Sequence, residues 1–256
     1  MKIVTWNVNS VRARLPRVLA WLEANQPDLV CLQETKCIDA HFPREPIEEL
    51  GYQVATFGQK TYNGVALLSN SNLEDVWRGF EGDASDEEAR VIAAQVDDFL
   101  VLNLYVVNGQ EVGKPKYAYK LEWLERVAQL IEARFDRAEK VVVTGDFNIT
   151  FDDRDVYDPE AWRDKILCSA PEREALARLT NLGLHDALRH FRDEGELYTW
   201  WDFRTRGFSR NRGLRIDHFL VSKPALDVCT GVEIDTEERG GEKPSDHAPV
   251  VATFRS

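Results

Sequence analysis

The sequence lacks any long uninterrupted apolar run. A membrane-spanning helix needs about 18 to 20 consecutive apolar residues, and no segment of this 256-residue chain approaches that length. The N-terminus, MKIVTWNVNS, enters a strand-like run without the basic and then apolar regions of a secretory signal peptide. We therefore expect a soluble, unexported, cytoplasmic protein with no membrane partner.

Cysteine is scarce, and its spacing suits neither a zinc finger nor a disulfide framework. The four cysteines, Cys31, Cys37, Cys168 and Cys229, form no C-x-x-C pair, and no histidine lies at zinc-finger spacing from them. In a chain of this length, such cysteines are usually small core residues. We expect reduced thiols that fill space in the core.

Positive charge is also in short supply. The chain has 32 Lys and Arg residues against 44 Asp and Glu residues, which gives a formal net charge of -12. This balance argues against a protein that holds a polyanion by bulk electrostatics. A nucleic-acid ligand would require local features, namely carboxylates gathered around bound Mg²⁺ and a basic surface confined to one face.

Internal repeats, low-complexity tracts and Pro/Gly/Ser linkers are absent as well. Their absence excludes a solenoid and gives no point at which the chain would divide. We expect one domain over residues 1–256 that acts as a monomer.

The chain does contain many short apolar runs rich in β-branched residues, which are typical of strands. They cover residues 2–6, 29–33, 64–69, 91–96, 100–106, 140–145, 214–221 and 249–254. Helical periodicity predicts a helix around 15–22, with Pro16 in its first turn, and further helices over 116–135, 171–182 and 185–191. Strands outnumber helices and several neighbours lack a helix between them, so the pattern favours an α/β sandwich over a barrel or a doubly wound sheet.

Polar or acidic residues stand at or near the ends of five of these runs. They are Asn7, Glu34, Tyr105, Asp146 and Asp217, and a sixth acid, Asp246, precedes His247 just before the last run. Ligand sites of sheet proteins commonly assemble at strand ends, so these side chains could converge. Each has a simpler explanation on its own, because an isolated Asp is often a turn former and a lone His is often structural. Only the combination of these residues indicates a functional site.

Six short motifs follow one another along the chain. They are WNVN (6–9), LQETK (32–36), LYVVNG (104–109), GDFN (145–148), LRID (214–217) and SDH (245–247). In this combination the chain resembles the exonuclease III and abasic-site endonuclease family of the endonuclease/exonuclease/phosphatase superfamily, over nearly its whole length. The resemblance implies a four-layered α/β sandwich with two mixed β-sheets packed face to face and helices outside. Val107 departs from the family's frequent Tyr-x-Pro pattern, which affects loop stiffness before chemistry.

The resemblance also implies a metal-dependent site for cleaving phosphodiesters. The expected ion is Mg²⁺, with Mn²⁺ as a substitute, because such ions prefer oxygen ligands. Glu34 matches the principal ligand. The residues implied around the metal are Asn7, Glu34, Asp146, Asn148, Asp246 and His247.

The implied catalytic residues are Tyr105, Asp146, Asn148, Asp217 and His247. Asp146 matches the acid that activates the attacking water or assists the leaving oxygen. Asn148 matches the amide that binds the phosphate, and Tyr105 the phenol that contacts the phosphate or the leaving group. A carboxylate partner raises the pKa of an imidazole, so His247 beside Asp217 favours a charged phosphate clamp, which leaves the base role to Asp146.

The segment 198–215, YTWWDFRTRGFSRNRGLR, bears on the substrate because it interleaves arginines with aromatic rings and runs directly into Asp217. Arginine binds phosphate and stacks on bases, and aromatic rings fill the space of a displaced base. By resemblance, Trp200, Leu214 and Ile216 line a pocket for a flipped-out abasic sugar or terminal nucleotide. We expect Phe208 and Arg212 at the same DNA-facing site. A solvated basic loop with core aromatics is the alternative.

The implied function is a DNA repair nuclease acting on double-stranded DNA with abasic sites or 3′ ends. It would remove nucleotides as a 3′–5′ exodeoxyribonuclease, incise DNA 5′ to abasic sites, or do both. Either activity would leave 3′-hydroxyl ends. One competing hypothesis is a phosphodiesterase or phosphatase of the same superfamily that acts on RNA or phosphorylated small molecules. Another is a non-catalytic DNA-binding module, which the loss of a motif residue would have indicated, but all of them are present.

Overall fold

The strands form two six-stranded sheets in the computed structural model, which describes residues 1–80, 88–136 and 138–255. The first sheet has the order β11 (Cys229–Ile234), β12 (Val250–Phe254), β1 (Lys2–Asn7), β2 (Leu29–Gln33), β4 (Val65–Ser69) and β3 (Gln53–Phe57). The second has the order β5 (Glu74–Arg78), β6 (Val91–Val96), β7 (Phe99–Tyr105), β8 (Lys140–Asp146), β10 (Asp217–Ser222) and β9 (Leu184–Asp186). The pairs β1–β2 and β7–β8 are parallel and the other pairs are antiparallel, so both sheets are mixed.

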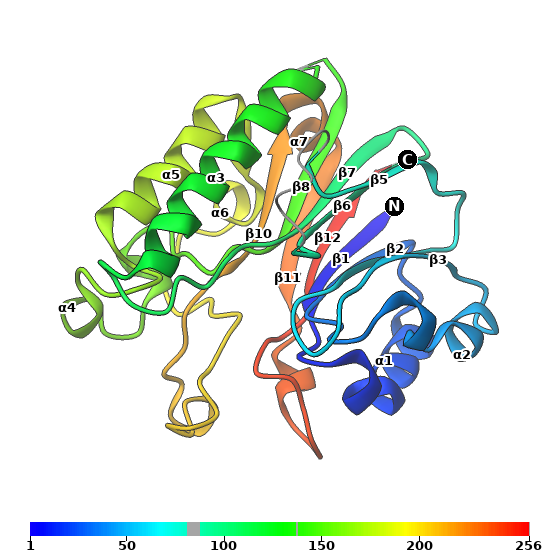
Figure 1. The fold of residues 1–256 in the computed structure, drawn as a ribbon, viewed down its shortest axis with the longest axis horizontal. Coiled ribbons are helices and arrows are strands. Elements are labelled where there is room, and N and C mark those ends of the chain that lie inside the picture. The colour runs from blue at the N-terminus through cyan, green and yellow to red at the C-terminus, as the bar shows by residue number, and fades with distance from the viewer. Residues whose placement is uncertain (81–87, 137, 256) are drawn as a thin grey trace.

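The two sheets pack face to face and the longer helices lie outside them (Figure 1). Ile3 and Val65 of the first sheet meet Ile92 and Val142 of the second in one buried cluster. The outer face of the first sheet is covered by α1 (Val11–Asn25) and α2 (Arg44–Glu48), and that of the second by α3 (Pro115–Arg134) and α5 (Ala170–Asn181). The other α-helices are α4 (Pro159–Trp162), α6 (Ala187–Phe191) and α7 (Lys223–Val228). This arrangement confirms the predicted four-layered α/β sandwich.

The strands that the sequence did not predict are the four sheet edges, β3, β5, β9 and β11. Their residues are only partly buried; in β5, for example, no side chain is fully buried. An edge strand has a neighbour on one side only and buries fewer side chains, so it lacks the apolar run that reveals an inner strand. The helix predicted over 185–191 was therefore wrong at its start, because its first residues form β9.

Two other predicted element boundaries were wrong. The strand predicted from residue 214 begins at Asp217, because Leu214 leaves the sheet to form bridges with Val156 and Trp200. Helix α1 begins at Val11, four residues before the apolar stripe, so Pro16 lies inside the helix and not in its first turn. Both Pro16 and the residue four positions earlier are exposed, so water can satisfy the carbonyl that lost its helical donor.

A polar bridge crosses the otherwise apolar space between the sheets. Gln33 Nε2 donates to Asn103 Oδ1 at 2.8 Å, and Asn103 Nδ2 donates to the backbone oxygen of Leu32 at 3.0 Å. Both side chains are fully buried. Because such bonds are directional, they fix how β2 and β7 lie against each other just below the strand ends that carry the site.

The four cysteines are all buried and free, as predicted. Within the described ranges, no helix is both long and apolar enough to cross a membrane.

Candidate active site

The strand-end residues converge because of the strand registers. In the second sheet, Asp146 at the end of β8 lies opposite Tyr105 of β7 on one side and opposite Asp217 of β10 on the other. In the first sheet, Asn7 at the end of β1 lies opposite the residue that precedes Glu34. The facing sheets bring both groups to one end of the sandwich.

One amide joins the two groups. Asn7 Nδ2 donates to Glu34 Oε1 at 2.9 Å and to Asp146 Oδ2 at 2.8 Å, and Asn7 is fully buried. The backbone here is unusual, because Glu34 and Asn148 have φ angles of 52° and 51°. Non-glycine residues seldom adopt this left-handed conformation, and it often marks a functional site. In this protein the left-handed conformation turns the side chains of Glu34 and Asn148 toward Asp146.

Glu34, Asp146 and His247 offer ligand atoms that lie within 4.8 Å of one another. The carboxylates of Glu34 and Asp146 suit a hard divalent cation. The imidazole of His247 fits a hydrogen-bond donor better, since Nδ1 is already bound to Asp217. The Lys36 ammonium lies 2.8 Å from the second oxygen of Glu34, so a cation entering this site would compete with it.

Asp246, which we expected beside the metal, has both oxygens engaged. Oδ1 accepts from Asn9 Nδ2 at 2.8 Å, and Oδ2 accepts from Trp200 Nε1 at 3.1 Å. It lies outside the group of close ligand atoms. Asp246 therefore lies beside the close ligand atoms, where its hydrogen bonds connect Asn9 and Trp200 to the site.

His247 and Asp217 form a buried pair. Nδ1 of His247 lies 2.9 Å and 3.1 Å from the two oxygens of Asp217, and Nε2 lies 3.7 Å from Asp146 Oδ2. Burial opposes protonation of His247, but the charges of Asp217 and Asp146 outweigh it and raise its pKa to about 10. Burial raises the pKa of Asp146 to about 7, although the positive charge of His247 opposes the shift. The pair thus presents a cationic donor beside a carboxylate able to accept a proton near neutral pH.

Tyr105 lies under a buried guanidinium. The Arg90 guanidinium carbon is 4.7 Å from the centre of the Tyr105 ring, and Arg90 Nη1 donates to the Tyr105 backbone oxygen at 3.2 Å. Burial and the negative charges of Glu34 and Asp146 hold the pKa of Tyr105 well above its ordinary value. The phenol therefore stays protonated and can donate a hydrogen bond.

The Asn148 side chain is held on both sides. Its Nδ2 donates to the Val106 backbone oxygen at 3.0 Å, and its Oδ1 accepts from Asn108 Nδ2 at 2.9 Å. Its backbone N–H donates to Asp146 Oδ1 at 2.9 Å. These contacts hold the amide, which was expected to bind the phosphate, beside Asp146.

The expected pocket residues lie in different places. Leu214 and Ile216 are buried in a small apolar cluster that Trp200 packs against, and Trp200 pairs with His247 in an isolated bridge. Phe208 packs on Trp201, with ring centres 5.2 Å apart. Arg212 lines a separate cavity of about 500 Å³, bordered also by Tyr157, Asp158, Glu196, Tyr198, Arg210 and Asn211. The structure thus joins Trp200, Leu214 and Ile216 to the site but does not bring Phe208 or Arg212 into contact with its carboxylates.

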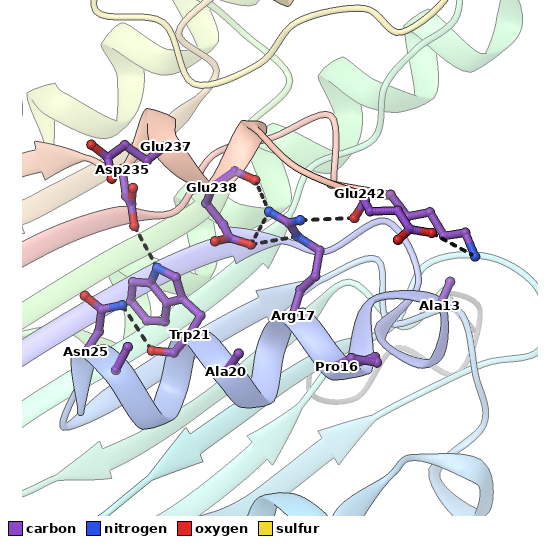
Figure 2. Close-up of a pocket in the computed structure, with 12 residues that line it drawn as sticks. Ala13, Pro16, Arg17, Ala20, Trp21, Asn25, Asp235, Glu237, Glu238 and Glu242 are labelled. Carbon is purple, nitrogen blue, oxygen red and sulfur yellow. Dashed lines mark hydrogen bonds and ion pairs between the residues drawn. The ribbon is translucent and has the colours of Figure 1, made fainter.

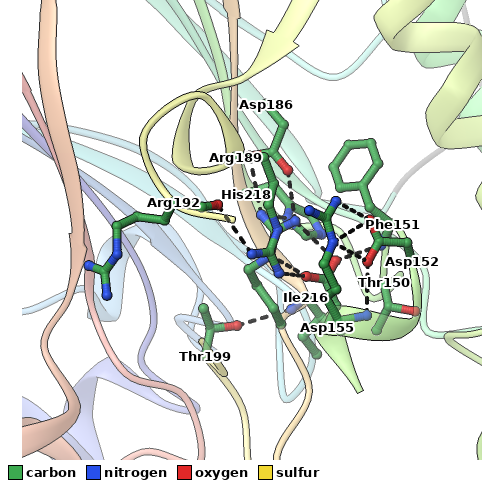
Figure 3. A network of polar contacts seen from close by, with 12 residues as sticks. Thr150, Phe151, Asp152, Asp155, Asp186, Arg189, Arg192, Thr199, Ile216 and His218 are labelled. Carbon is green, nitrogen blue, oxygen red and sulfur yellow. Dashed lines mark hydrogen bonds and ion pairs between the residues drawn. The ribbon is translucent and has the colours of Figure 1, made fainter. Parts of the chain in front are cut away.

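Arg215, the last arginine of the segment 198–215, does not reach the site. It is fully buried, and its guanidinium binds Asp155 and Asp186 at 2.8 Å and 2.7 Å, in the network of Figure 3. His218 Nδ1 lies 3.1 Å from it and His218 Nε2 lies 2.7 Å from the Ile149 backbone oxygen. Arg215 supports the site from behind because it joins the loop after β8 to the start of β10.

In the described part of the chain, four residues that contact the site were not among the expected ones: Asn9, Lys36, Asn108 and Arg90. Asn9 and Lys36 each lie two residues beyond an expected residue, and Lys36 Nζ donates to Asn9 Oδ1 at 2.6 Å. Asn108 belongs to the LYVVNG motif, so its motif was a usable signal. Arg90 had no local signal, because the antiparallel pairing of β6 and β7 alone brings it to Tyr105.

A spacious groove lies away from these residues. It has a volume of about 830 Å³ and runs between α1 and the segment around η4 (Thr236–Arg239), with Arg17 bound to Glu238 across it (Figure 2). None of the converging strand-end residues lines this groove. Cavity size alone therefore does not locate the chemistry.

Comparison with known proteins places this site in a family. Residues 4–247 match the family model described as the endonuclease/exonuclease/phosphatase family. The chain is 37% identical to exodeoxyribonuclease III of Haemophilus influenzae over 100% of both chains, and 31% identical to DNA repair nuclease APEX1 of Danio rerio, with 98% of this chain and 81% of that protein covered.

Solved structures give the same result. A Neisseria 3′ phosphatase, NExo, bound to product DNA hairpin has a TM-score of 0.98 and 45% identity over 100% of both chains. An AP endonuclease from Archaeoglobus fulgidus has a TM-score of 0.96 and 36% identity, again over 100% of both chains. The chain therefore belongs to the endonuclease/exonuclease/phosphatase family, with exonuclease III and AP endonuclease homologues along its full length.

Proposed function

We propose that this protein is a metal-dependent DNA repair nuclease that hydrolyses phosphodiesters of double-stranded DNA. It would act at 3′ ends, at abasic sites or at both, and leave 3′-hydroxyl ends, as one catalytic domain over residues 1–256. The observation that carries the proposal is the amide of Asn7, which holds Glu34 and Asp146 together opposite the cationic pair of His247 and Asp217. The names of its homologues support DNA as the substrate.

The side chains divide the chemistry among them. Protonated His247 would donate to a non-bridging phosphate oxygen, with Asp217 holding its ring. Asp146 would accept the proton of the attacking water as the new P–O bond forms, and Tyr105 would donate to the oxygen of the bond that breaks. A bound Mg²⁺ or Mn²⁺, held by Glu34 and Asp146, supplies neutralisation of the phosphate charge.

The apolar residues beside the site favour DNA over a small-molecule substrate. Leu214 and Ile216 directly precede Asp217, and Trp200 reaches Asp246 through its indole N–H. Leu214 and Ile216 are fully buried and support the partly exposed ring of Trp200, which would supply the apolar wall that a sugar lacking its base contacts. We propose this wall as the place of a flipped-out abasic sugar or of the terminal nucleotide.

Removal of 3′-phosphate from DNA ends is a second candidate activity. It is favoured by the 45% identical Neisseria structure, which is named a 3′ phosphatase. The same side chains can serve it, since the bond that breaks is again a P–O bond at a 3′ oxygen.

End-labelled duplexes test the proposal. One carries an abasic-site analogue, one a recessed 3′-hydroxyl end and one a 3′-phosphate, each with Mg²⁺ or with EDTA. Asp146→Asn should abolish all metal-dependent cleavage, and Asp153→Asn, at an exposed acid that pairs with Arg173, should cleave like the wild type. Wild-type inertness toward all three duplexes with Mg²⁺ or Mn²⁺ would overturn the proposal, and the ratio of the three rates would identify the dominant activity.

A further inference from the structure

Two buried opposite charges lie behind the site and take no part in the chemistry proposed above. Lys120 of α3 and Glu172 of α5 form an ion pair with no exposed surface on either side chain. Burying two charges costs desolvation energy, and well-packed apolar residues usually stabilise such an interface at least as well. Stability of the α3–α5 contact therefore does not account for the pair.

The remaining bonds of Lys120 lead to the site. Its Nζ donates to the Asn148 backbone oxygen at 2.8 Å and to the Asn108 backbone oxygen at 3.2 Å. These oxygens belong to the loops that follow β8 and β7, and the two asparagine side chains are themselves bonded at 2.9 Å. One ammonium thus holds both loops from the inside, which compensates for the left-handed backbone of Asn148.

The turn after Asn108 rests directly on the lysine stem. Gly109 has a φ of 88°, and a Cβ at this position would lie 3.0 Å from Lys120 Cδ and 2.9 Å from Ile166 Cδ1. Only a residue without a side chain allows this approach. The position of the loop is therefore set by the position of Lys120.

Glu172 connects the same ammonium to the pocket wall. Its Oε1 accepts from Leu167 N at 3.1 Å, and its Oε2 accepts from Ser169 N at 3.1 Å and from Ser169 Oγ at 2.6 Å. Leu167 packs in the apolar cluster of Leu214 and Ile216, and its backbone oxygen accepts from Thr150 N at 2.8 Å. The ion pair thus reaches three loops: one carrying Asn108, one carrying Asn148 and one forming part of the wall.

We infer that Lys120 and Glu172 are positioning residues that hold the Asn148 amide at a fixed place relative to the pocket wall. The inference rests on the proposed function together with the role that the family resemblance implies for Asn148, which is to bind the scissile phosphate. Its physical basis is preorganisation, because an amide already held in place loses no entropy when the transition state forms.

The test uses the double variant Lys120→Met/Glu172→Gln, which leaves no unpaired buried charge. Its kcat should fall about tenfold while KM changes less than about twofold, since the lost ordering matters most in the transition state. Val127→Ala, a buried change on α3 away from the loops, is the matched control and should lower thermal stability without lowering kcat. Should the double variant not fold, Ser169→Ala, which removes one hydrogen bond to Glu172 and leaves both charges paired, should give a smaller effect in the same direction.

A double-mutant cycle separates positioning from a general structural role. If Lys120 acts through Asn148, the double variant should change kcat less than about twofold in the Asn148→Ala background, because coupled residues are not additive. A full tenfold loss in that background would overturn the inference, as would an unchanged kcat in the wild-type background.

Hydrogen exchange keeps this test independent of the proposed function. Amides in segments 106–111 and 147–151 should exchange at least about tenfold faster in the double variant, with no such change in Val127→Ala. If the wild type cleaves no DNA duplex but these amides still exchange faster in the double variant, the proposed function fails. The inference that Lys120 and Glu172 hold the two loops in place still stands. Unchanged exchange in both segments would show that Lys120 and Glu172 do not hold these loops, whatever the activity of the variant.

Discussion

Asn7 Nδ2 lies 2.8 Å from Asp146 Oδ2, and this contact joins the last residue of β1 in one sheet to the last residue of β8 in the other. The same nitrogen also donates to Glu34 Oε1. One neutral side chain therefore separates and orients two carboxylates that would otherwise repel each other.

Replacing Asn7 should disturb both carboxylates at once. We expect Asn7→Ala to lower kcat by about 10- to 100-fold, because misplaced catalytic groups lose most of their advantage from orientation. The measurement is steady-state cleavage of the abasic-site duplex, with a thermal melt to verify folding. Full activity in a folded Asn7→Ala protein would contradict the role of the amide.

Removing the partner of His247 should weaken the phosphate clamp. In Asp217→Asn the imidazole loses the nearest charge that keeps it protonated, so kcat should fall by about 100-fold or more. Single-turnover cleavage of the same duplex measures the chemical step. If Asp217→Asn retains wild-type single-turnover rates, His247 does not act as a cation held by Asp217.

Metal dependence should centre on Glu34. Glu34→Gln removes a negative oxygen from the pair of carboxylates, so we expect the Mg²⁺ concentration for half-maximal activity to rise by about tenfold or more. A titration of activity against Mg²⁺ measures this, with EDTA as the zero point. Glu45→Gln, an acid near the start of α2, is the control and should leave the titration unchanged.

His218, in the network of Figure 3, should lose its contribution to stability in mild acid. Burial and the charge of Arg215 lower the pKa of His218 from 6.5 to about 4. Between these values the unfolded chain binds a proton that the folded protein does not, so neutral His218 contributes stability that is fully present above pH 6.5 and is lost as pH falls toward 4. The loss should approach about 1.4 kcal/mol per pH unit.

Urea unfolding at pH 7, 6, 5 and 4.5 measures that loss. The stability of the wild type relative to His218→Gln should decrease over this pH range, whereas its stability relative to His185→Gln, at an exposed histidine, should not change. Equal slopes in the wild type and His218→Gln would contradict this account. Burial alone would raise the pKa of Asp155, but Arg215 holds it below its ordinary value, so Asp155 adds a further loss only at lower pH.

The sequence by itself determined the inner strands, the main helices and the chemical groups at the strand ends. Inner strands are apolar on both faces, and this pattern is readable without knowledge of their partners. The motif residues Glu34, Asp146 and His247 were likewise visible because each stands next to a strand with its own local signal.

Only the tertiary structure decided the edge strands, the place of Arg215 and the contacts of Arg90 and Lys120. Edge strands depend on a neighbour from elsewhere in the chain, and a charged side chain is buried only where distant segments supply its partners. Arg215 sits in a sequence that suggests DNA contact, yet Asp155 and Asp186 hold it inside. Lys120 is indistinguishable in sequence from the surface lysines of an amphipathic helix, because the backbone oxygens that bind it come from loops that only the folded sheets bring together.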